Sequence, residues 1–258
     1  MFGFDRHGHG IMNGGGPREY GTILDNMIKS DRPTKKHQPR RLPILHEDKD
    51  IIVVVKPAGL LTIGTDREKS RTAHYLLNDY VRKGNPKSRN RVYVVHRIDK
   101  DTSGVLIFAK SEQTKKFLQE DWENTEKHYL AIVHGRLTAK EGTISSCLVE
   151  NKAQRVYSTR DAAKGKLSHT AYKVLEESKR FSLVDIHLLT GRKHQIRVHF
   201  AEKGHPVAGD RKYENKDIGS KRLALHARSI SFTHPSTHKL MTFDTGIPED
   251  FIRLFRKL

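Results

Sequence analysis

Two apolar runs of the chain are separated by the polar stretch that decides the fold, Val95-His96-Arg97-Ile98-Asp99-Lys100-Asp101-Thr102-Ser103-Gly104. One run ends at Val95 and the next covers residues 105–109, so we predict a strand on each side. A carboxylate rarely enters a protein interior unless a partner satisfies its charge. Asp99 is therefore either part of a turn, with Arg97 as its strand-end ion pair, or part of an active site.

The residues that follow Asp99 favour the turn when they are taken alone. Asp101, Thr102 and Ser103 have short polar side chains that can bond the local backbone, and Gly104 tolerates positive φ. The choice between a turn and an active site therefore depends on the rest of the chain.

The charge of the chain indicates a polyanionic partner. The sequence has 48 Lys and Arg residues against 30 Asp and Glu residues, a formal net charge of +18. Nucleic acid is the expected partner. Solubility alone is the alternative, but it needs a smaller excess than this.

The cysteine and histidine content predicts neither disulfides nor a metal site. The single cysteine, Cys147, allows no intrachain disulfide, which predicts a reducing compartment and a cytoplasmic protein. Among the 16 histidines, His194 and His199 are separated by five positions and so do not share the helical face that a two-histidine zinc helix needs. No apolar run approaches the roughly 20 residues of a membrane helix, so no membrane partner is expected.

The chain divides into a tail and one folded domain. Residues 1–41 are rich in glycine, proline and basic side chains and are predicted to form a flexible basic arm, with a segment of no function as the alternative. The ordered domain is predicted to begin near Leu42. Apolar patterns predict strands at 44–45, 51–55, 127–133, 170–175, 182–189, 223–232 and 239–243, and helices at 72–82, 112–122 and 251–255. Strands that follow one another directly predict an α+β fold with a mixed, largely antiparallel central sheet and flanking helices.

A second dense polar stretch is Thr190-Gly191-Arg192-Lys193-His194-Gln195-Ile196-Arg197-Val198-His199. Its periodicity fits either a strand or a helix. If it is a helix, Thr190 is expected to cap it, and the free amides of the first turn favour an anion. A solvated basic face is the alternative interpretation.

Four motifs resemble those of the RluA-type pseudouridine synthases, in the order of that family: His96-Arg97-Ile98-Asp99, Lys127-His128-Tyr129-Leu130-Ala131, Thr190 to His199, and Gly204-His205-Pro206-Val207-Ala208-Gly209-Asp210. The segments Val55-Lys56-Pro57-Ala58-Gly59-Leu60 and Leu225-His226-Ala227 are similar as well. Ile98 departs from the usual leucine, and Thr62-Ile63-Gly64 stands where His-Pro is frequent. The resemblance implies that residues 42–258 form a pseudouridine synthase catalytic domain.

The resemblance also implies an enzyme that isomerises specific uridines of structured RNA, ribosomal or transfer RNA, to pseudouridine without a cofactor. Asp99 is then the catalytic carboxylate, acting as nucleophile or base. Arg197 is implied to pair with Asp99. Tyr129 is implied to stack on the uracil, and its hydroxyl to help remove the carbon 5 proton.

Substrate binding is implied for Arg97, which would hold the flipped-out nucleotide. His96 is expected to orient this loop, and Lys56, Arg192 and Lys193 are expected phosphate contacts. The main alternative is a non-catalytic RNA-binding or RNA-folding factor on the same scaffold. A metal-dependent nuclease is the weaker alternative, since no acidic cluster for two metals is evident. A monomer with no obligate protein partner is expected.

Overall fold

The computed structural model describes residues 39, 42–64, 68, 70–214 and 222–257, so nearly all of the predicted arm at 1–41 lies outside the described residues. The strands are β1 (Ile44–Glu47), β2 (Ile51–Lys56), β3 (Tyr93–Val94), β4 (Ser103–Ala109), β5 (Glu126–His134), β6 (Glu141–Glu150), β7 (Val156–Thr159), β8 (Lys166–Glu177), β9 (Phe181–Leu188), β10 (Leu225–Thr233) and β11 (Leu240–Asp244). They form one sheet in the order β1-β2-β4-β10-β5-β9-β8-β6-β7, with β3 paired to β4 and β11 paired to β10.

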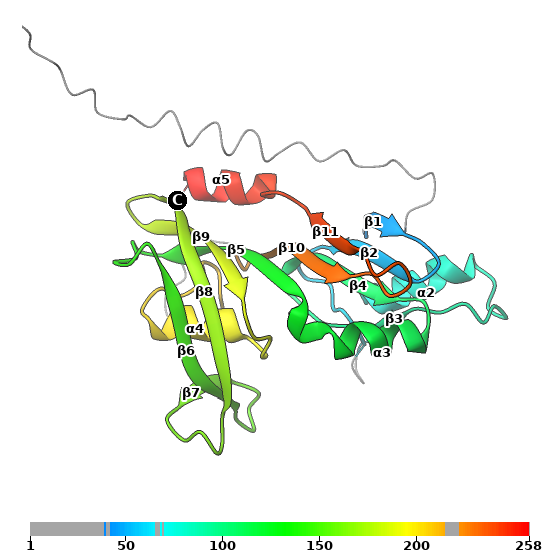
Figure 1. The fold of residues 1–258 in the computed structure, drawn as a ribbon. Coiled ribbons are helices and arrows are strands. Elements are labelled where there is room, and N and C mark those ends of the chain that lie inside the picture. The colour runs from blue at the N-terminus through cyan, green and yellow to red at the C-terminus, as the bar shows by residue number, and fades with distance from the viewer. Residues whose placement is uncertain (1–38, 40–41, 65–67, 69, 215–221, 258) are drawn as a thin grey trace, which may run out of the picture.

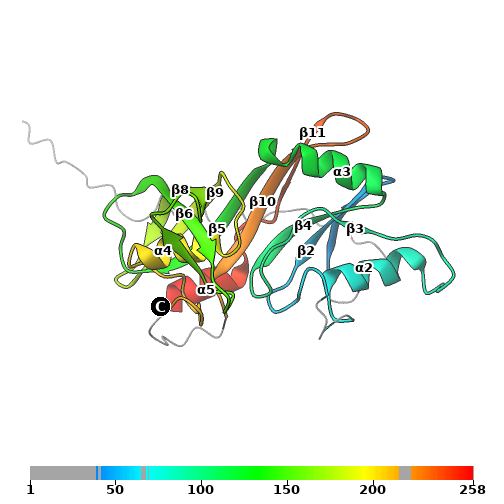
Figure 2. The same cartoon turned by 90° about the horizontal axis from the view of Figure 1, so that it is seen from below.

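Helices flank this sheet in both halves of the molecule. They are α2 (Ala73–Arg82), α3 (Glu112–Glu120), α4 (Gln195–Glu202) and α5 (Glu249–Lys257), with a short 3-10 turn at Trp122–Asn124. Figures 1 and 2 show α2 and α3 beside β2–β4, α4 and α5 beside β5–β9, and β10 between the halves. The predicted α+β class is confirmed. Within the described residues, no helix is long and apolar enough to cross a membrane.

The continuous apolar runs of β2 and β4 are buried on both faces. Alternate residues such as Val54 and Leu106 pack toward α2, whereas Val53 and Ile107 pack toward α3. A strand covered on both faces does not need the alternation of polar and apolar residues that a half-exposed strand shows. The two helices therefore fix the strands from which the Asp99 stretch projects.

The two halves meet where β4 and β10 pair in parallel, with Gly104 opposite Ala227. Gly104 has φ +123°, and a Cβ added there would lie 2.1 Å from the Ala227 carbonyl oxygen. Only glycine allows this approach. Ser103 also lies in the strand and bonds His226 Nδ1 at 2.8 Å. The turn predicted for Ser103 and Gly104 is therefore wrong, because both residues belong to the start of β4.

We expect Gly104→Ala to lower the free energy of unfolding by about 3 kcal/mol or more, because the added methyl group forces β4 and β10 apart. The matched control is Gly204→Ala, where φ is +82° but no atom lies within 4 Å of the added Cβ. That control should cost only about 1 kcal/mol. Urea unfolding of both variants measures the difference, and equal losses would contradict the role of Gly104 at this junction.

Candidate active site

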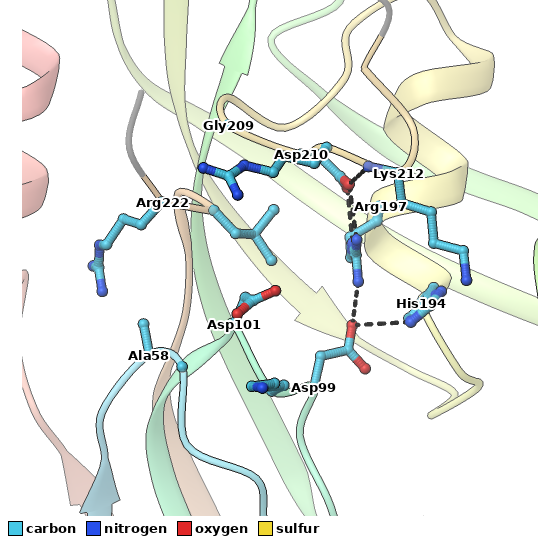
Figure 3. A pocket seen from close by; sticks show the side chains of 13 residues that line it. Ala58, Asp99, Asp101, His194, Arg197, Gly209, Asp210, Lys212 and Arg222 are labelled. Atoms are coloured by element: carbon cyan, nitrogen blue, oxygen red, sulfur yellow. Dashed lines mark hydrogen bonds and ion pairs between the residues drawn. The ribbon is translucent and has the colours of Figure 1, made fainter. Parts of the chain in front are cut away.

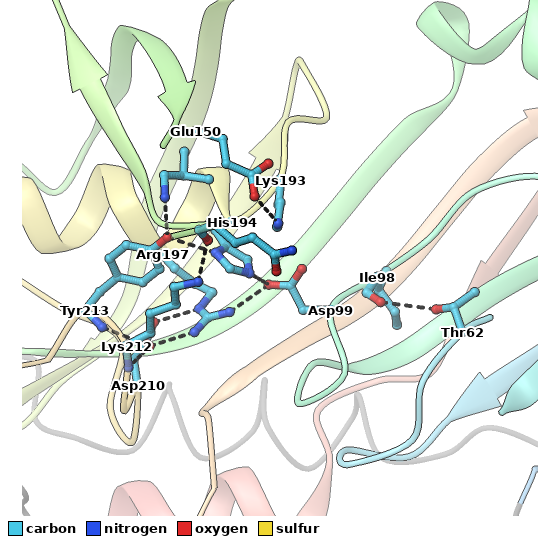
Figure 4. A network of polar contacts seen from close by, with 12 residues as sticks. Thr62, Ile98, Asp99, Glu150, Lys193, His194, Arg197, Asp210, Lys212 and Tyr213 are labelled. Atoms are coloured by element: carbon cyan, nitrogen blue, oxygen red, sulfur yellow. Dashed lines mark hydrogen bonds and ion pairs between the residues drawn. The ribbon is translucent and has the colours of Figure 1, made fainter. Parts of the chain in front are cut away.

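The loop that carries Asp99 connects β3 to β4. The end of β2 and the segment that follows β2 hold this loop in place through hydrogen bonds. The buried ammonium of Lys56 donates to the carbonyls of Pro57 at 3.0 Å, Leu60 at 2.7 Å and Lys100 at 2.9 Å. Thr62 Oγ1 donates to the Ile98 carbonyl at 3.1 Å, on the other side of Asp99 (Figure 4). These bonds fix the backbone on both sides of the carboxylate.

Lys56 does not fit the predicted phosphate contact. Its side chain is 0% exposed, and all three N–H groups of the ammonium are taken by backbone carbonyls. Burial lowers the pKa of Lys56 to about 7, while the carboxylates of Asp101 and Asp99 oppose that shift. This geometry contradicts the prediction, and Lys56 instead positions the Asp99 loop.

Arg197, in the first turn of α4, joins Asp99 to a second carboxylate. Its Nη1 donates to Asp99 Oδ2 at 2.9 Å, and its Nε and Nη2 each bond a different oxygen of Asp210 at 2.7 Å (Figures 3 and 4). Asp210 has a 0% exposed side chain, against 10% for Arg197 and 25% for Asp99. Burial opposes the guanidinium charge, but the Asp210 and Asp99 contacts prevail and raise the pKa of Arg197. The cation is therefore permanent and aimed at Asp99.

The two oxygens of the Asp99 carboxylate have different surroundings. Oδ2 faces Arg197 and lies 3.7 Å from His194 Nε2. Among the described residues, Oδ1 has no hydrogen-bond partner. A bidentate Arg–carboxylate pair is geometrically specific. The two bonds to Asp210 therefore fix the orientation of the Arg197 guanidinium, and with it the direction of its bond to Asp99.

His194 and Tyr213 form a second support on the same side of Asp99. Tyr213 Oη accepts from the Val156 amide at 3.1 Å and lies 2.8 Å from His194 Nδ1. Burial lowers the pKa of His194, which the Asp99 charge opposes and nearby cations reinforce. A neutral ring that accepts the Tyr213 hydroxyl proton at Nδ1 carries its own proton on Nε2, toward Asp99.

The helix that carries Arg197 settles the ambiguity of residues 190–199. Helix α4 starts at Gln195, with His194 in the left-handed region at φ 53° and without a side-chain cap. Thr190 Oγ1 donates to Gln195 Oε1 at 2.9 Å, so the predicted Thr190 cap is wrong. Gln195 Nε2 in turn donates to Thr170 Oγ1 of β8 at 2.9 Å. The Gln195 amide thus pins the loop before α4 to the sheet.

Tyr129 extends from β5 into the cavity that contains Asp99. Burial, and to a smaller extent the Asp99 carboxylate, raise the pKa of Tyr129. Its hydroxyl has no hydrogen-bond partner among the residues that the structure describes. Tyr129 is therefore a neutral phenol that lines the same cavity as Asp99.

Two adjoining cavities of about 710 Å³ and 750 Å³ meet at Asp99, Lys100, His194 and Arg197. Basic residues surround both: Arg97, Lys100, Arg192, Lys193, Arg211, Lys212 and Arg222. The carboxylate thus lies at the centre of a cleft with a cationic rim, which suits a polyanion.

The remaining predicted contacts differ in exposure. Arg97 and Arg192 are exposed and line the cavity. Lys193 lines it too and pairs with Glu150 (Figure 4). His96 accepts the Ile107 amide at 3.1 Å and lies 4.5 Å from the Trp122 ring, centroid to centroid. The Arg97–Asp99 ion pair of the turn alternative does not form among the described residues, and Asp99 pairs with Arg197 instead, as the resemblance implied.

Away from this cleft, Asp48, Asp50 and His234 are close enough to share a metal ion. His234 Nδ1 accepts from the Ser236 amide at 3.3 Å and the Thr237 amide at 3.1 Å, so its proton is on Nε2, which donates to Asp48 Oδ2 at 3.0 Å. A metal on Nε2 would have to displace that proton. The cluster is therefore better explained as a hydrogen-bonded contact between the β1–β2 turn and the β10–β11 turn than as a metal site.

Asp210, His194 and Tyr213 are the site residues that the sequence predictions did not select. Asp210 ends the Gly204–Asp210 motif, and His194 lies within the 190–199 motif, so each had a local signal. Spacing along the chain gives no indication that Arg197 binds both Asp99 and Asp210 with one guanidinium. That bridge belongs to the tertiary structure, in which α4 packs against β6, β7 and β8.

The site is therefore a cleft with a cationic rim, in which one guanidinium holds the Asp99 carboxylate. Residues 50–202 match the RNA pseudouridylate synthase family. The RNA pseudouridine synthase YlyB of Bacillus subtilis is 37% identical over 236 residues, which are 86% of this chain and 74% of that protein. The ribosomal large subunit pseudouridine synthase C of Escherichia coli is 34% identical over 229 residues, which are 83% of this chain and 69% of that protein.

The solved structure of human RNA pseudouridylate synthase domain containing 4 has the same fold, with a TM-score of 0.70 at 24% identity over 83% of this chain and 92% of that chain. This chain belongs to the RNA pseudouridine synthase family. It is an RNA pseudouridine synthase, an isomerase that acts on uridine in RNA.

Proposed function

We propose that Asp99 is the catalytic carboxylate, with Arg197 as the residue that positions it and Tyr129 as the residue that contacts the base. The observation that supports this most strongly is the bridge in which one guanidinium binds buried Asp210 through two bonds and Asp99 through one. Among the described residues, the second oxygen of Asp99 has no partner at the meeting point of two cavities, which a purely structural ion pair does not require. The arrangement fits a reacting group better.

The isomerisation needs one bond broken and one formed on the same base. The bond from nitrogen 1 of uracil to the ribose breaks, the base turns, and carbon 5 forms the new bond. Carbon 5 then loses its proton and nitrogen 1 gains one, so no oxidant or reductant is consumed. The open Oδ1 of Asp99 can add to the sugar or base as nucleophile, or remove a ribose proton. Either route uses the charged carboxylate that Arg197 holds.

Tyr129 suits a stacking role on the uracil. An aromatic ring in a cavity offers a π-face to a base, and such stacking contributes about 1–3 kcal/mol. Because the raised pKa keeps Tyr129 protonated, its hydroxyl fits a hydrogen-bond donor better than the base that removes the carbon 5 proton. This revises the hydroxyl role implied by the sequence.

The cationic rim supports a role in holding the rest of the nucleotide. The target uridine has to leave its stack to reach Asp99, which costs about a few kcal/mol. Exposed Arg97 is suited to hold the flipped nucleotide, and Arg192 and Lys193 are suited to bind flanking phosphates. His96, whose ring accepts the Ile107 amide, fits the orientation of this loop.

Ribosomal RNA of the large subunit is the substrate class that we propose first, since relatives such as the Escherichia coli protein are named for it. Transfer RNA is the second candidate. The basic residues 1–41 are proposed to add phosphate contacts, and the lone Cys147 supports action in the cytoplasm.

The proposal is tested by incubating the protein with unmodified large-subunit ribosomal RNA and, separately, with unmodified transfer RNA. Pseudouridine mapping should show one or a few uridines converted in the ribosomal RNA. Conversion of transfer RNA alone would overturn the substrate class. Conversion of neither RNA would overturn the proposed function.

A further inference from the structure

A basic loop far from the catalytic cleft has no part in the proposed chemistry. It joins α2 to β3 and extends from the end of the molecule opposite β6 and β7 (Figures 1 and 2). Its residues 82–91 read Arg-Lys-Gly-Asn-Pro-Lys-Ser-Arg-Asn-Arg, with five cations and no acid. All five cationic side chains are exposed. Among the described residues, Lys83, Lys87, Arg89 and Arg91 have no ion-pair partner.

The backbone of this loop is held in place by its own polar side chains. Asn85 Oδ1 accepts from the Lys87 amide at 3.0 Å, and Ser88 Oγ accepts from the Asn90 amide at 3.2 Å. Asn78 Oδ1 of α2 accepts from the Val92 amide at 3.0 Å, which closes the loop against the helix. A loop ordered before binding loses less conformational freedom when a ligand arrives.

The loop borders a groove of about 1320 Å³, to which Lys83, Arg89 and Arg91 contribute together with the rings of Tyr80 and Tyr93. Three acidic residues also line the groove: Glu47, Asp79 and Glu112. Glu47 and Glu112 have cationic partners. Glu47 bonds Lys110 Nζ and the Tyr80 hydroxyl, each at 2.8 Å, and Glu112 bonds Lys115 at 2.7 Å. The net field of the groove is therefore positive, and a polyanion is the ligand class it favours.

Helix α2 sets the distance between this groove and the catalytic cleft. Its first residues bond the cleft rim, because the amides of Ala73 and His74 donate to the carbonyls of Leu61 at 2.8 Å and Thr62 at 3.0 Å. The basic loop follows the other end of the helix. Ten helical residues span about 15 Å, so an RNA strand or stem that continues past the target uridine can reach both places.

From this geometry we infer that the α2–β3 groove is a second RNA-binding site, which takes backbone phosphates of a segment remote from the flipped uridine. The inference rests on the proposed function, in which the cleft holds the target nucleotide. It predicts that the enzyme prefers an RNA that extends along α2 over a minimal stem-loop. Contacts of this kind add affinity that depends on salt and not on base sequence.

The test replaces the four unpaired cations together, as Lys83→Gln, Lys87→Gln, Arg89→Gln and Arg91→Gln. The control variant removes the same charge from exposed cations elsewhere, as Lys173→Gln, Lys179→Gln, Lys239→Gln and Arg253→Gln. Fluorescence anisotropy measures the binding of each variant to the unmodified large-subunit ribosomal RNA transcript and to a short stem-loop cut from it. Thermal unfolding confirms that both variants fold.

We expect the loop variant to bind the long transcript about tenfold or more weakly at low salt, and the slope of log K against log salt to shrink by about 3. The short stem-loop should keep its affinity, and the control variant should bind the long transcript nearly as wild type does. Equal losses in the loop and control variants, or equal losses on both RNAs, would overturn the second site. Since binding is the readout, it stands or falls separately from the catalytic proposal, which fails if wild type converts no uridine.

Discussion

Asp99→Asn is expected to bind RNA as tightly as the wild type and to form pseudouridine about 10³-fold more slowly, or not at all. The asparagine keeps the size of the side chain and can still accept a hydrogen bond from Arg197. It cannot serve as the nucleophile or base that the free Oδ1 would provide. Chromatographic quantification of pseudouridine in ribosomal RNA measures the loss, and a filter-binding assay measures affinity.

The matched control for this variant is Asp101→Asn, two residues away in the same loop. Asp101 also lines one of the cavities, but among the described residues it has no ion pair with Arg197. Its variant should keep a rate close to that of the wild type. If Asp101→Asn were the inactive variant and Asp99→Asn the active one, the catalytic assignment would be wrong.

Arg197→Ala has the second large effect that we expect, on both stability and rate. Asp210 is fully buried and would lose its cation, and breaking such a pair typically costs about 3–5 kcal/mol. The rate per bound RNA should fall by about 100-fold or more, because Asp99 loses the donor that orients it. Urea unfolding gives the first quantity, and single-turnover kinetics at saturating enzyme gives the second.

Arg197→Lys separates the two effects if the alanine variant fails to fold. A lysine keeps one charge beside Asp210 but lacks the planar fork that also reaches Asp99. The rate should stay low while much of the stability returns. Arg211→Ala, on the exposed rim of the same cleft, should weaken binding but not the rate at saturation. A wild-type rate in Arg197→Lys would rule out positioning through the guanidinium fork.

Much of the fold could be predicted because its central strands have strong apolar signals. Residues 51–54 and 105–109 are buried, and their continuous apolar runs are typical of strands covered on both faces. Strands β6 and β7 were missed, since Ile144, Leu148 and Val156 are the buried residues of two otherwise polar segments. Strand β6 pairs with β7 and β8, and α4 packs against both β6 and β7. These tertiary contacts stabilise the two strands, and the local sequence of β6 and β7 does not reveal them.

The candidate site was predicted in part and for a similar reason. Asp99, Tyr129 and Arg197 lie in motifs, and the structure brings all three to one cavity. Lys56 was misassigned because a lysine before a turn looks the same in sequence whether it faces solvent or three backbone carbonyls. Asp210 was missed because its bond to Arg197 joins α4 to the loop that follows it, and only the tertiary structure sets that contact.

The most direct test of Asp99 uses RNA that carries tritium on carbon 5 of uridine, mixed with enzyme in excess. Since the new bond forms at carbon 5, each conversion releases one tritium to solvent. We predict that wild type releases tritium in a single turnover, and that Asp99→Asn, with the RNA fully bound, releases none above background. Release by bound Asp99→Asn at a rate within about tenfold of wild type would contradict the account.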